Sequence, residues 1–202
     1  YELHNDTFAA MIEFVPGNKN QVHHVNCDMV KYQFDKKGNV FAGERVVDMV
    51  NDTASLLQAY QRLGLPNDDG SYPELQKSVV NYLPGVVGQL YPEGIGGYYL
   101  PRKGLFLLND LHYGFTKEQD ITDSSYINIF FAKTPPRRPA QEFQLGTIGV
   151  APVEPDLVIQ SNTVKHVWSK YTIPADISIL TVNPHMHLLG QSFKAYALQP
   201  NG

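Results

Sequence analysis

Seven histidines occur among the 202 residues, and five of them fall in three short clusters. The clusters are the adjacent pair His23 and His24, the single His112, and the pair His185 and His187. Imidazole is the commonest metal ligand among the side chains. A chain that gathers its histidines in this way is therefore a candidate metal-binding protein, and the three clusters together are a stronger signal than any one alone.

The pair His185 and His187 lies in the stretch NPHMHLLG, shortly after the apolar run ISILTV. Residues two apart on a strand point to the same face, so these two imidazoles can converge on one ion without distortion. The alternative is a polar stripe that faces solvent, with Met186 between them as the core residue.

The doublet His23–His24 and the single His112 require more of the backbone. Neighbouring strand residues face opposite ways, so both members of the doublet reach one ion only at a β-bulge or a strand end. Otherwise one imidazole lies in the core and the other in water, although imidazoles in an apolar strand are costly without partners. His112 shares a strand face with Asp110 and Gly114 in LNDLHYG, and alone it is more typical of a hydrogen-bonded structural histidine.

The ligand types predict which metal suits the clusters. Imidazoles favour copper or zinc, and no carboxylate stands at a fixed short spacing to complete a non-haem iron site. Two sites are natural: one built from His23, His24 and His112, and another on His185 and His187. The segment that separates them suggests that each site belongs to its own domain.

Three neighbouring residues have two interpretations each. Asp28 and Asp110 are close enough in sequence to orient an imidazole through a hydrogen bond, and surface solvation explains them equally well. Cys27 is the only cysteine, so no internal disulfide forms. Its apolar surroundings favour a small buried residue over a ligand or a nucleophile.

The elements that must position these residues are predicted to be short strands separated by turns. Aromatic and β-branched runs bounded by Gly, Pro, Asn and Asp are typical of strands. They occur at 8–18, 21–35, 105–115, 125–133, 166–173, 177–189 and 192–198. This pattern predicts an all-β protein with a jelly-roll-like antiparallel sandwich.

One region, 51–82, predicts a helical insertion. Asp52 or Thr53 is the expected N-cap of a first helix, and Gly64 follows its last apolar residue in the position typical of a C-terminal cap. The segment 71–83 is a candidate second short helix with Pro73 near its start. A Gly- and Pro-rich loop over 84–104 follows, and its length implies either a function or order imposed by packing.

Proline spacing and charge indicate the domain organisation and exclude some partners. We expect a first domain over 1–134, a linker over 135–150, and over 151–202 the beginning of a second similar domain that is incomplete within this chain. The net charge is −4, and no basic run exceeds two residues, so no nucleic-acid partner is expected. No apolar run is long enough for a transmembrane helix.

Three motifs, in this order, resemble the copper type II, ascorbate-dependent monooxygenases, a family that includes the peptidylglycine and dopamine hydroxylating enzymes. IEFVPGNKNQVHHV is similar to the family's strand, turn and strand ending in a histidine doublet. YYLPRKGLFLLNDLHYG is similar to its segment that ends in HYG, and IPADISILTVNPHMHLLGQSFKAYALQPNG to its His-x-His strand and hairpin. The motif PHMHLLG is most similar to the corresponding sequence of bacterial members.

The resemblance implies two jelly-roll-like domains with one copper each. His23, His24 and His112 would bind the electron-supplying copper, and His185 and His187 the catalytic copper at which O₂ is activated. The substrate would be a small molecule, and ascorbate or another electron donor would supply electrons. Copper exposed to O₂ chemistry fits a periplasmic, cell-surface or secreted protein.

The chain also departs from the family pattern. The family's second copper has a methionine ligand downstream of the His-x-His motif, and no methionine follows His187 here. We therefore expect this piece alone to be inactive as a hydroxylase. Asn183 stands where the peptide-amidating member has a substrate-binding arginine, which argues against a peptide substrate. The alternative function is a non-catalytic jelly-roll module that binds copper or another ligand.

Overall fold

The computed structural model describes residues 1–86, 88, 90–117, 120–147 and 149–199, in which it contains six strands and one short helix. In chain order these are β1 (Thr7–Val15), β2 (Val22–Tyr32), α1 (Leu56–Arg62), β3 (Glu74–Tyr82), β4 (Tyr98–Leu100), β5 (Lys103–Tyr113) and β6 (Tyr126–Phe131). The chain divides into two compact units, Tyr1–Phe143 and Gln144–Gly202. The division falls inside the expected linker 135–150, and all seven elements belong to the first unit.

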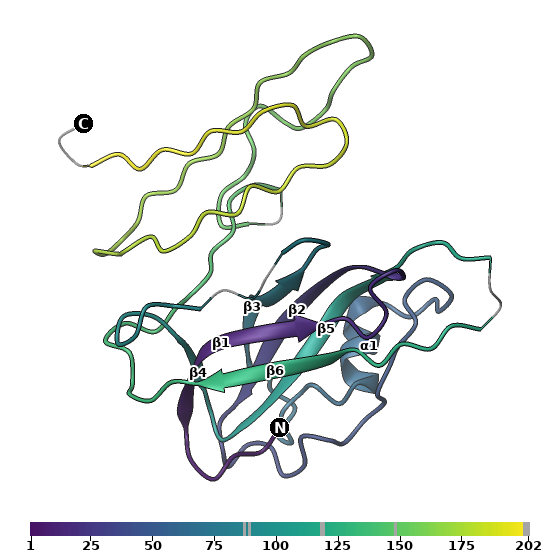
Figure 1. The fold of residues 1–202 in the computed structure, drawn as a ribbon, viewed down its shortest axis with the longest axis vertical. Coiled ribbons are helices and arrows are strands. Elements are labelled where there is room, and N and C mark those ends of the chain that lie inside the picture. Colours follow the sequence, from purple (N-terminus) through teal and green to yellow (C-terminus); the bar gives the residue numbers. More distant parts are fainter. Residues whose placement is uncertain (87, 89, 118–119, 148, 200–202) are drawn as a thin grey trace. The chain divides into compact units, whose positions relative to one another are not determined.

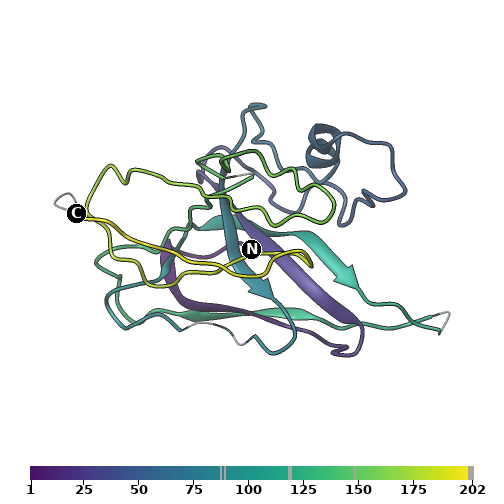
Figure 2. The same ribbon diagram turned by 90° about the horizontal axis from the view of Figure 1, so that it is seen from above.

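The first unit is an antiparallel β-sandwich, which confirms the predicted all-β fold class. One sheet has the strand order β4-β1-β6 and the other β3-β2-β5, and they form two layers (Figures 1 and 2). Alternate residues of each strand point between the layers. The buried side chains there are those of Ala9, Ile12, Phe14, Val22, Val25, Cys27, Met29, Val79, Val80, Tyr98 and Leu100.

Leu100 offers a direct test of this core because its side chain is fully buried. Replacing Leu100 with alanine leaves a cavity that the rigid sheets fill only in part. We expect the free energy of unfolding to fall by about 2–5 kcal/mol, measured by urea denaturation. Leu57→Ala is the matched control, because that leucine is exposed and its loss should change stability by less than about 0.5 kcal/mol.

The outer face of the β3-β2-β5 sheet is covered at one end by α1 and the segments on either side of it (Figure 2). The side chains that pack there are Val30, Tyr32, Val40, Tyr60, Leu63, Leu65, Leu105 and Leu107. The other end of this face, where β2 begins and β5 ends, carries the histidines. The insertion therefore covers the end of the face that lies away from the histidines.

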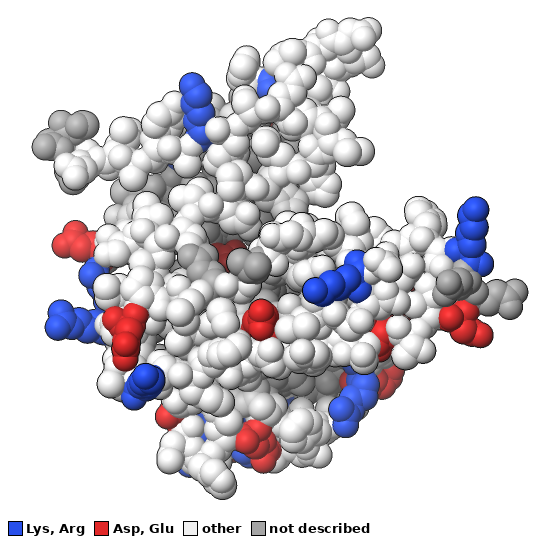
Figure 3. Space-filling view, in the orientation of Figure 1, with Lys and Arg blue, Asp and Glu red and all other residues white. Residues whose placement is uncertain are grey.

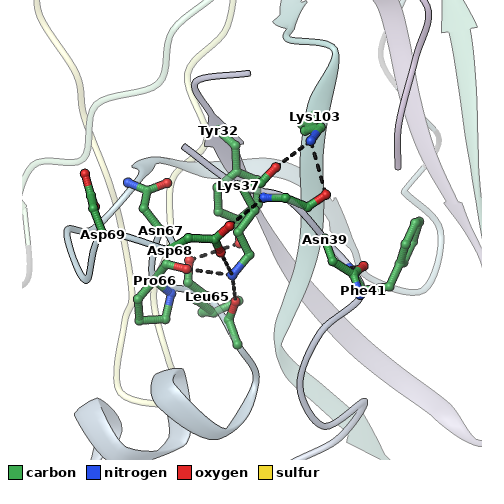
Figure 4. Close-up of polar contacts among 12 residues, drawn as sticks. Tyr32, Lys37, Asn39, Phe41, Leu65, Pro66, Asn67, Asp68, Asp69 and Lys103 are labelled. Carbon is green, nitrogen blue, oxygen red and sulfur yellow. Dashed lines mark hydrogen bonds and ion pairs between the residues drawn. The ribbon is translucent and has the colours of Figure 1, made fainter. Parts of the chain in front are cut away.

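The buried ammonium of Lys37 fastens this insertion (Figure 4). Its Nζ donates hydrogen bonds to the carbonyl oxygens of Gly64 at 2.8 Å and Pro66 at 2.7 Å. Carbonyls just beyond a helix C-terminus lack helical partners and carry partial negative charge. Lys37 satisfies them, and the Tyr32 hydroxyl donates to the neighbouring Leu65 carbonyl at 3.0 Å.

The start of α1 differs from the sequence-based expectation. The N-cap is Ser55, not Asp52 or Thr53, and the backbone and side chains of Ser55 and Gln58 form a reciprocal capping box. The Ser-x-x-Gln spacing satisfies two free N–H groups at once, which a cap at the earlier positions does not. Gly64 has a φ of 68°, as a residue directly after the helix end requires, so this part of the prediction is confirmed.

Asp52 instead forms an ion pair with Arg62, whose guanidinium also contacts both carboxylate oxygens of Glu44. The hydrogen bonds from Arg62 lower the pKa of Glu44 and of Asp52. A carboxylate whose pKa is lower in the folded state stabilises the fold above its unfolded pKa of about 4, and loses that contribution as the pH falls through the folded value.

Arg62→Gln should therefore reduce the free energy of unfolding at pH 7 and have a smaller effect at pH 3. Urea denaturation of both proteins at the two pH values measures the difference. Arg138→Gln, which removes an exposed arginine, should show no such pH dependence. A pH-independent effect of Arg62→Gln would show that the ion pairs contribute nothing.

Two expectations for the region 71–104 are wrong. The candidate second helix over 71–83 is strand β3, paired with β2, because pairing and burial of Val79 and Val80 outweigh local helix propensity. The segment expected to be a loop over 84–104 contains β4, which pairs with β1 through Thr7–Leu100, Phe8–Tyr99 and Ala9–Tyr98. Residues 87 and 89 of that segment lie outside the described residues.

The second unit does not contain the three strands expected over 166–173, 177–189 and 192–198. Among its described residues, one isolated bridge joins Glu154 and Trp168, and most side chains after 156 are exposed. A strand needs a neighbour for its N–H and C=O groups and a buried face. Apart from that single bridge, the described residues after 156 form no strand pairing, so the predicted second jelly roll stays a prediction.

Charged side chains of both signs are interspersed on the face drawn in Figure 3, without a continuous basic patch there. Across the described part of the chain, α1 is the only helix, and it is far too short to cross a bilayer.

Candidate metal centre

The histidine doublet lies at a β-bulge, the condition that its convergence on one ion requires. Val22 pairs with Tyr113 and His24 pairs with His112, so His23 is an extra residue of β2 without a partner on β5. An extra residue interrupts the strict alternation of side chains. The imidazole of His23 therefore lies on the same outer side as those of His24 and His112.

The three imidazoles lie close enough to share one ion. Their ring centroids are 5.0–5.4 Å apart, and one ligand nitrogen from each lies within 4.8 Å of the others. The Nδ1 atoms of His23 and His24 are 3.0 Å apart. Nitrogens bound to one ion at about 2.0–2.1 Å are themselves about 3 Å apart, so this pair already has the spacing of two ligands.

Asp110 selects the tautomer of the His24 imidazole. A carboxylate accepts, so Nε2 of His24 donates to Oδ2 of Asp110 at 2.8 Å, and Nδ1 is left as the nitrogen that faces His23. Asn26 donates from Nδ2 to the same carboxylate oxygen at 3.1 Å and thereby holds it. A carboxylate that accepts from the distal nitrogen of a histidine sets its tautomer and its orientation toward a metal.

Of the two aspartates considered from the sequence, only Asp110 contacts an imidazole. Asp28 is buried and binds Ser78 and Asn109, so it neither orients a histidine directly nor lies on the surface. Asn26 was not predicted. The sequence signal that could have identified it is its position two residues after His24, which places both on one face of a strand; its pairing opposite Asp110 is seen only in the structure.

The centre is open to solvent. His23 and His112 are exposed, and the side chain of His24 retains 24% of its accessible surface. Cys27, beside it in sequence, is fully buried on the inner face, and burial raises the pKa of its thiol to about 12. Its predicted role as a small buried residue is confirmed, and the candidate ligands are imidazoles alone.

His185 and His187 also converge, although the segment is not a strand. Their Nε2 atoms are 3.0 Å apart, with ring centroids at 5.0 Å, and both residues are exposed. Met186 between them packs against Gly190, where an added Cβ would come within 2.5 Å of the Met186 side chain. Within the described residues, only the first cluster gathers three potential ligands, so this second one offers two.

Three imidazoles without a carboxylate ligand suit copper or zinc. Because the cluster is exposed, an ion held there would be accessible from solvent. Comparisons of the chain with known protein families, with curated proteins and with solved structures found no match. The site assignments therefore rest on the residues, their spacing and their geometry.

Proposed function

We propose that the intact protein is a copper-dependent monooxygenase that hydroxylates a C–H bond of a small molecule with O₂ and an external reductant such as ascorbate. The observation that carries the proposal is the bulge in β2, which turns two consecutive histidines toward a third one on β5. The three ordered motifs that resemble the type II copper family support copper over zinc.

In this proposal the two clusters have different roles. His23, His24 and His112 hold an electron-storing copper, with Asp110 and Asn26 fixing the ligand geometry. His185 and His187 hold the copper that supplies the oxygen chemistry when it is bound. Two imidazoles leave room for a further ligand and for O₂, whereas three imidazoles already form a stable electron-transfer site.

The proposed location follows from this chemistry. Exposed copper ligands and an external reductant fit the periplasm, the cell surface or the extracellular space. The sequence of the third motif, PHMHLLG, favours a bacterial source. The main alternative is a non-catalytic module that binds copper without turnover. It draws on the fact that the three-histidine cluster lies wholly within the first unit.

A labelling experiment separates the two functions. The intact protein, loaded with copper and supplied with ascorbate and ¹⁸O₂, is incubated with a panel of small molecules that carry benzylic or aliphatic C–H bonds. Mass spectrometry should detect one ¹⁸O in the product, and none with His185→Ala or His187→Ala. Product formation by either variant would refute the role of that cluster. Copper binding without any product would favour the binding module.

A further inference from the structure

A buried carboxylate, that of Asp28, lies where all three strands of the β3-β2-β5 sheet meet. Asp28 is 4% exposed and lies on β2, four residues beyond His24 on the same outer face. Its Oδ1 accepts a hydrogen bond from the backbone N–H of Ser78 on β3 at 2.9 Å. Its Oδ2 accepts from Nδ2 of Asn109 on β5 at 2.7 Å.

Asn109 is itself an extra residue. Cys27 pairs with Leu108 and Asn26 pairs with Asp110, so Asn109 has no partner on β2. The alternation of inward- and outward-facing residues along β5 is interrupted at this point. Side chains from both sides of Asn109 line one open pocket together with Phe14 and Ile127 of the facing sheet; they are those of Phe106, Leu108, Leu111 and Tyr113. The spacing between inward residues is thus two, then three, then two.

This interruption of the alternation determines on which face of the sheet His112 lies. Strict alternation from the inward Leu108 would turn residues 110 and 112 inward as well. The extra residue instead places Asp110 and His112 on the outer face, opposite Asn26 and His24. The third imidazole of the centre is therefore available only because β5 bulges at Asn109.

On the opposite side, β3 is also irregular beside Asp28. Only Asp28 separates Cys27 from Met29, whereas three residues separate their partners Val80 and Gln76. Ser78, in the middle of these three, has a φ of 54°, and its N–H turns to the carboxylate. A buried N–H needs a partner, and Asp28 supplies it.

We propose that Asp28 is a positioning residue of the three-histidine centre: its carboxylate clamps the Asn109 and Ser78 bulges and so sets the β5 register that presents His112. As a statement about a metal centre, this rests on the proposed copper site. As a statement about register, it can be tested in the metal-free protein.

The test compares Asp28→Ala with Asp28→Asn in the full chain. Alanine removes both acceptors. Asparagine keeps one acceptor for Ser78, and a flip of the Asn109 amide lets it accept from the new NH₂ group, so both hydrogen bonds persist. Asn109→Ala removes only the hydrogen bond between Asn109 and Asp28, and it replaces Asp28→Ala in the experiment if that variant does not fold.

Two readouts are measured. In metal-free, isotope-labelled protein, cross-strand NOEs for the pairs His24–His112 and Asn26–Asp110 report the register. With Cu(II) as the ligand, competition titration gives the affinity and EPR gives the number of coordinated nitrogens. We expect Asp28→Ala to lose both NOEs and one nitrogen ligand, and to bind Cu(II) about 10–100-fold more weakly. Asp28→Asn should keep both NOEs and all three nitrogens.

Leu100→Ala is the control for general destabilisation, because Leu100 lies in the other sheet, on β4. It should keep both NOEs and the three-nitrogen signal. An Asp28→Ala protein with both NOEs and unchanged copper affinity would overturn the proposal, and so would equal losses in Leu100→Ala. If wild type binds no Cu(II) but the NOEs respond as expected, the copper function fails while the register assignment stands.

Discussion

Replacing both His23 and His24 by alanine is expected to abolish the tight binding of one copper ion per chain. The two residues supply two of the three imidazoles, and their Nδ1 atoms, 3.0 Å apart, already have the separation of ligands on one ion. His112 alone offers one nitrogen, which cannot hold copper against water and buffer. The fold should survive, because His23 is exposed and the His24 side chain still reaches solvent, and surface changes cost little stability.

The measurement is copper content per chain after dialysis, under oxidising and under reducing conditions. Two double variants are matched controls. His4→Ala with His166→Ala removes two exposed histidines outside the clusters and should leave the copper content unchanged. His185→Ala with His187→Ala should retain the tightly bound ion. Wild type without copper under either condition would make the family resemblance one of fold alone and favour a module that binds another ligand.

The strands that build the first unit could be predicted because their apolar residues alternate over long runs. β2 and β6 lie within segments expected from the sequence, and β1 and β5 overlap theirs but begin one and two residues earlier. β3 was missed because its local composition also suits a helix, and its pairing with β2 decides the outcome. The segments after 156 carry the same kind of pattern without forming a ladder, because periodicity states which face is apolar but not whether a neighbouring strand is present.

From the sequence, the three histidines of the candidate centre, the need for a bulge at the doublet and Asp110 as one possible orienting residue could be named. Residue types and spacing indicated that His23 and His24 need a bulge to converge, and the structure has one there. The compensating bulge at Asn109 could not be predicted. A bulge depends on how two strands are paired over their whole length. The sequence of a single strand does not show where the alternation of its inward- and outward-facing residues is interrupted.

Asp110→Asn is expected to weaken copper binding and to raise the reduction potential of the bound ion. The Asp110 carboxylate accepts from Nε2 of His24 at 2.8 Å and is held by Asn26. Its negative charge makes the imidazole a stronger donor and stabilises Cu(II) more than Cu(I). Asparagine retains an oxygen that can accept the same hydrogen bond, so the imidazole keeps its orientation while the charge is lost.

Losses of such partners typically reduce metal affinity by about 10–100-fold. Asp110 is half exposed, so solvent screens part of its charge and the effect of Asp110→Asn should lie at the lower end of this range. Asp110→Ala, which also removes the hydrogen bond, should lie at the upper end. Asn26→Ala should have a smaller effect, because it frees the carboxylate without removing it.

Competition titration with Cu(I) and Cu(II) measures both affinities, and their ratio gives the shift in potential. In Asp110→Asn the Cu(II) affinity should fall more than the Cu(I) affinity. Asp35→Asn, which neutralises an exposed carboxylate in the turn after β2, controls for net charge and should leave the ratio unchanged. Equal losses for the two oxidation states would mean that Asp110 orients His24 but does not tune the metal. An unchanged Cu(II) affinity in Asp110→Ala would show that Asp110 plays no part in the centre, because this variant loses the hydrogen bond that connects the carboxylate to His24.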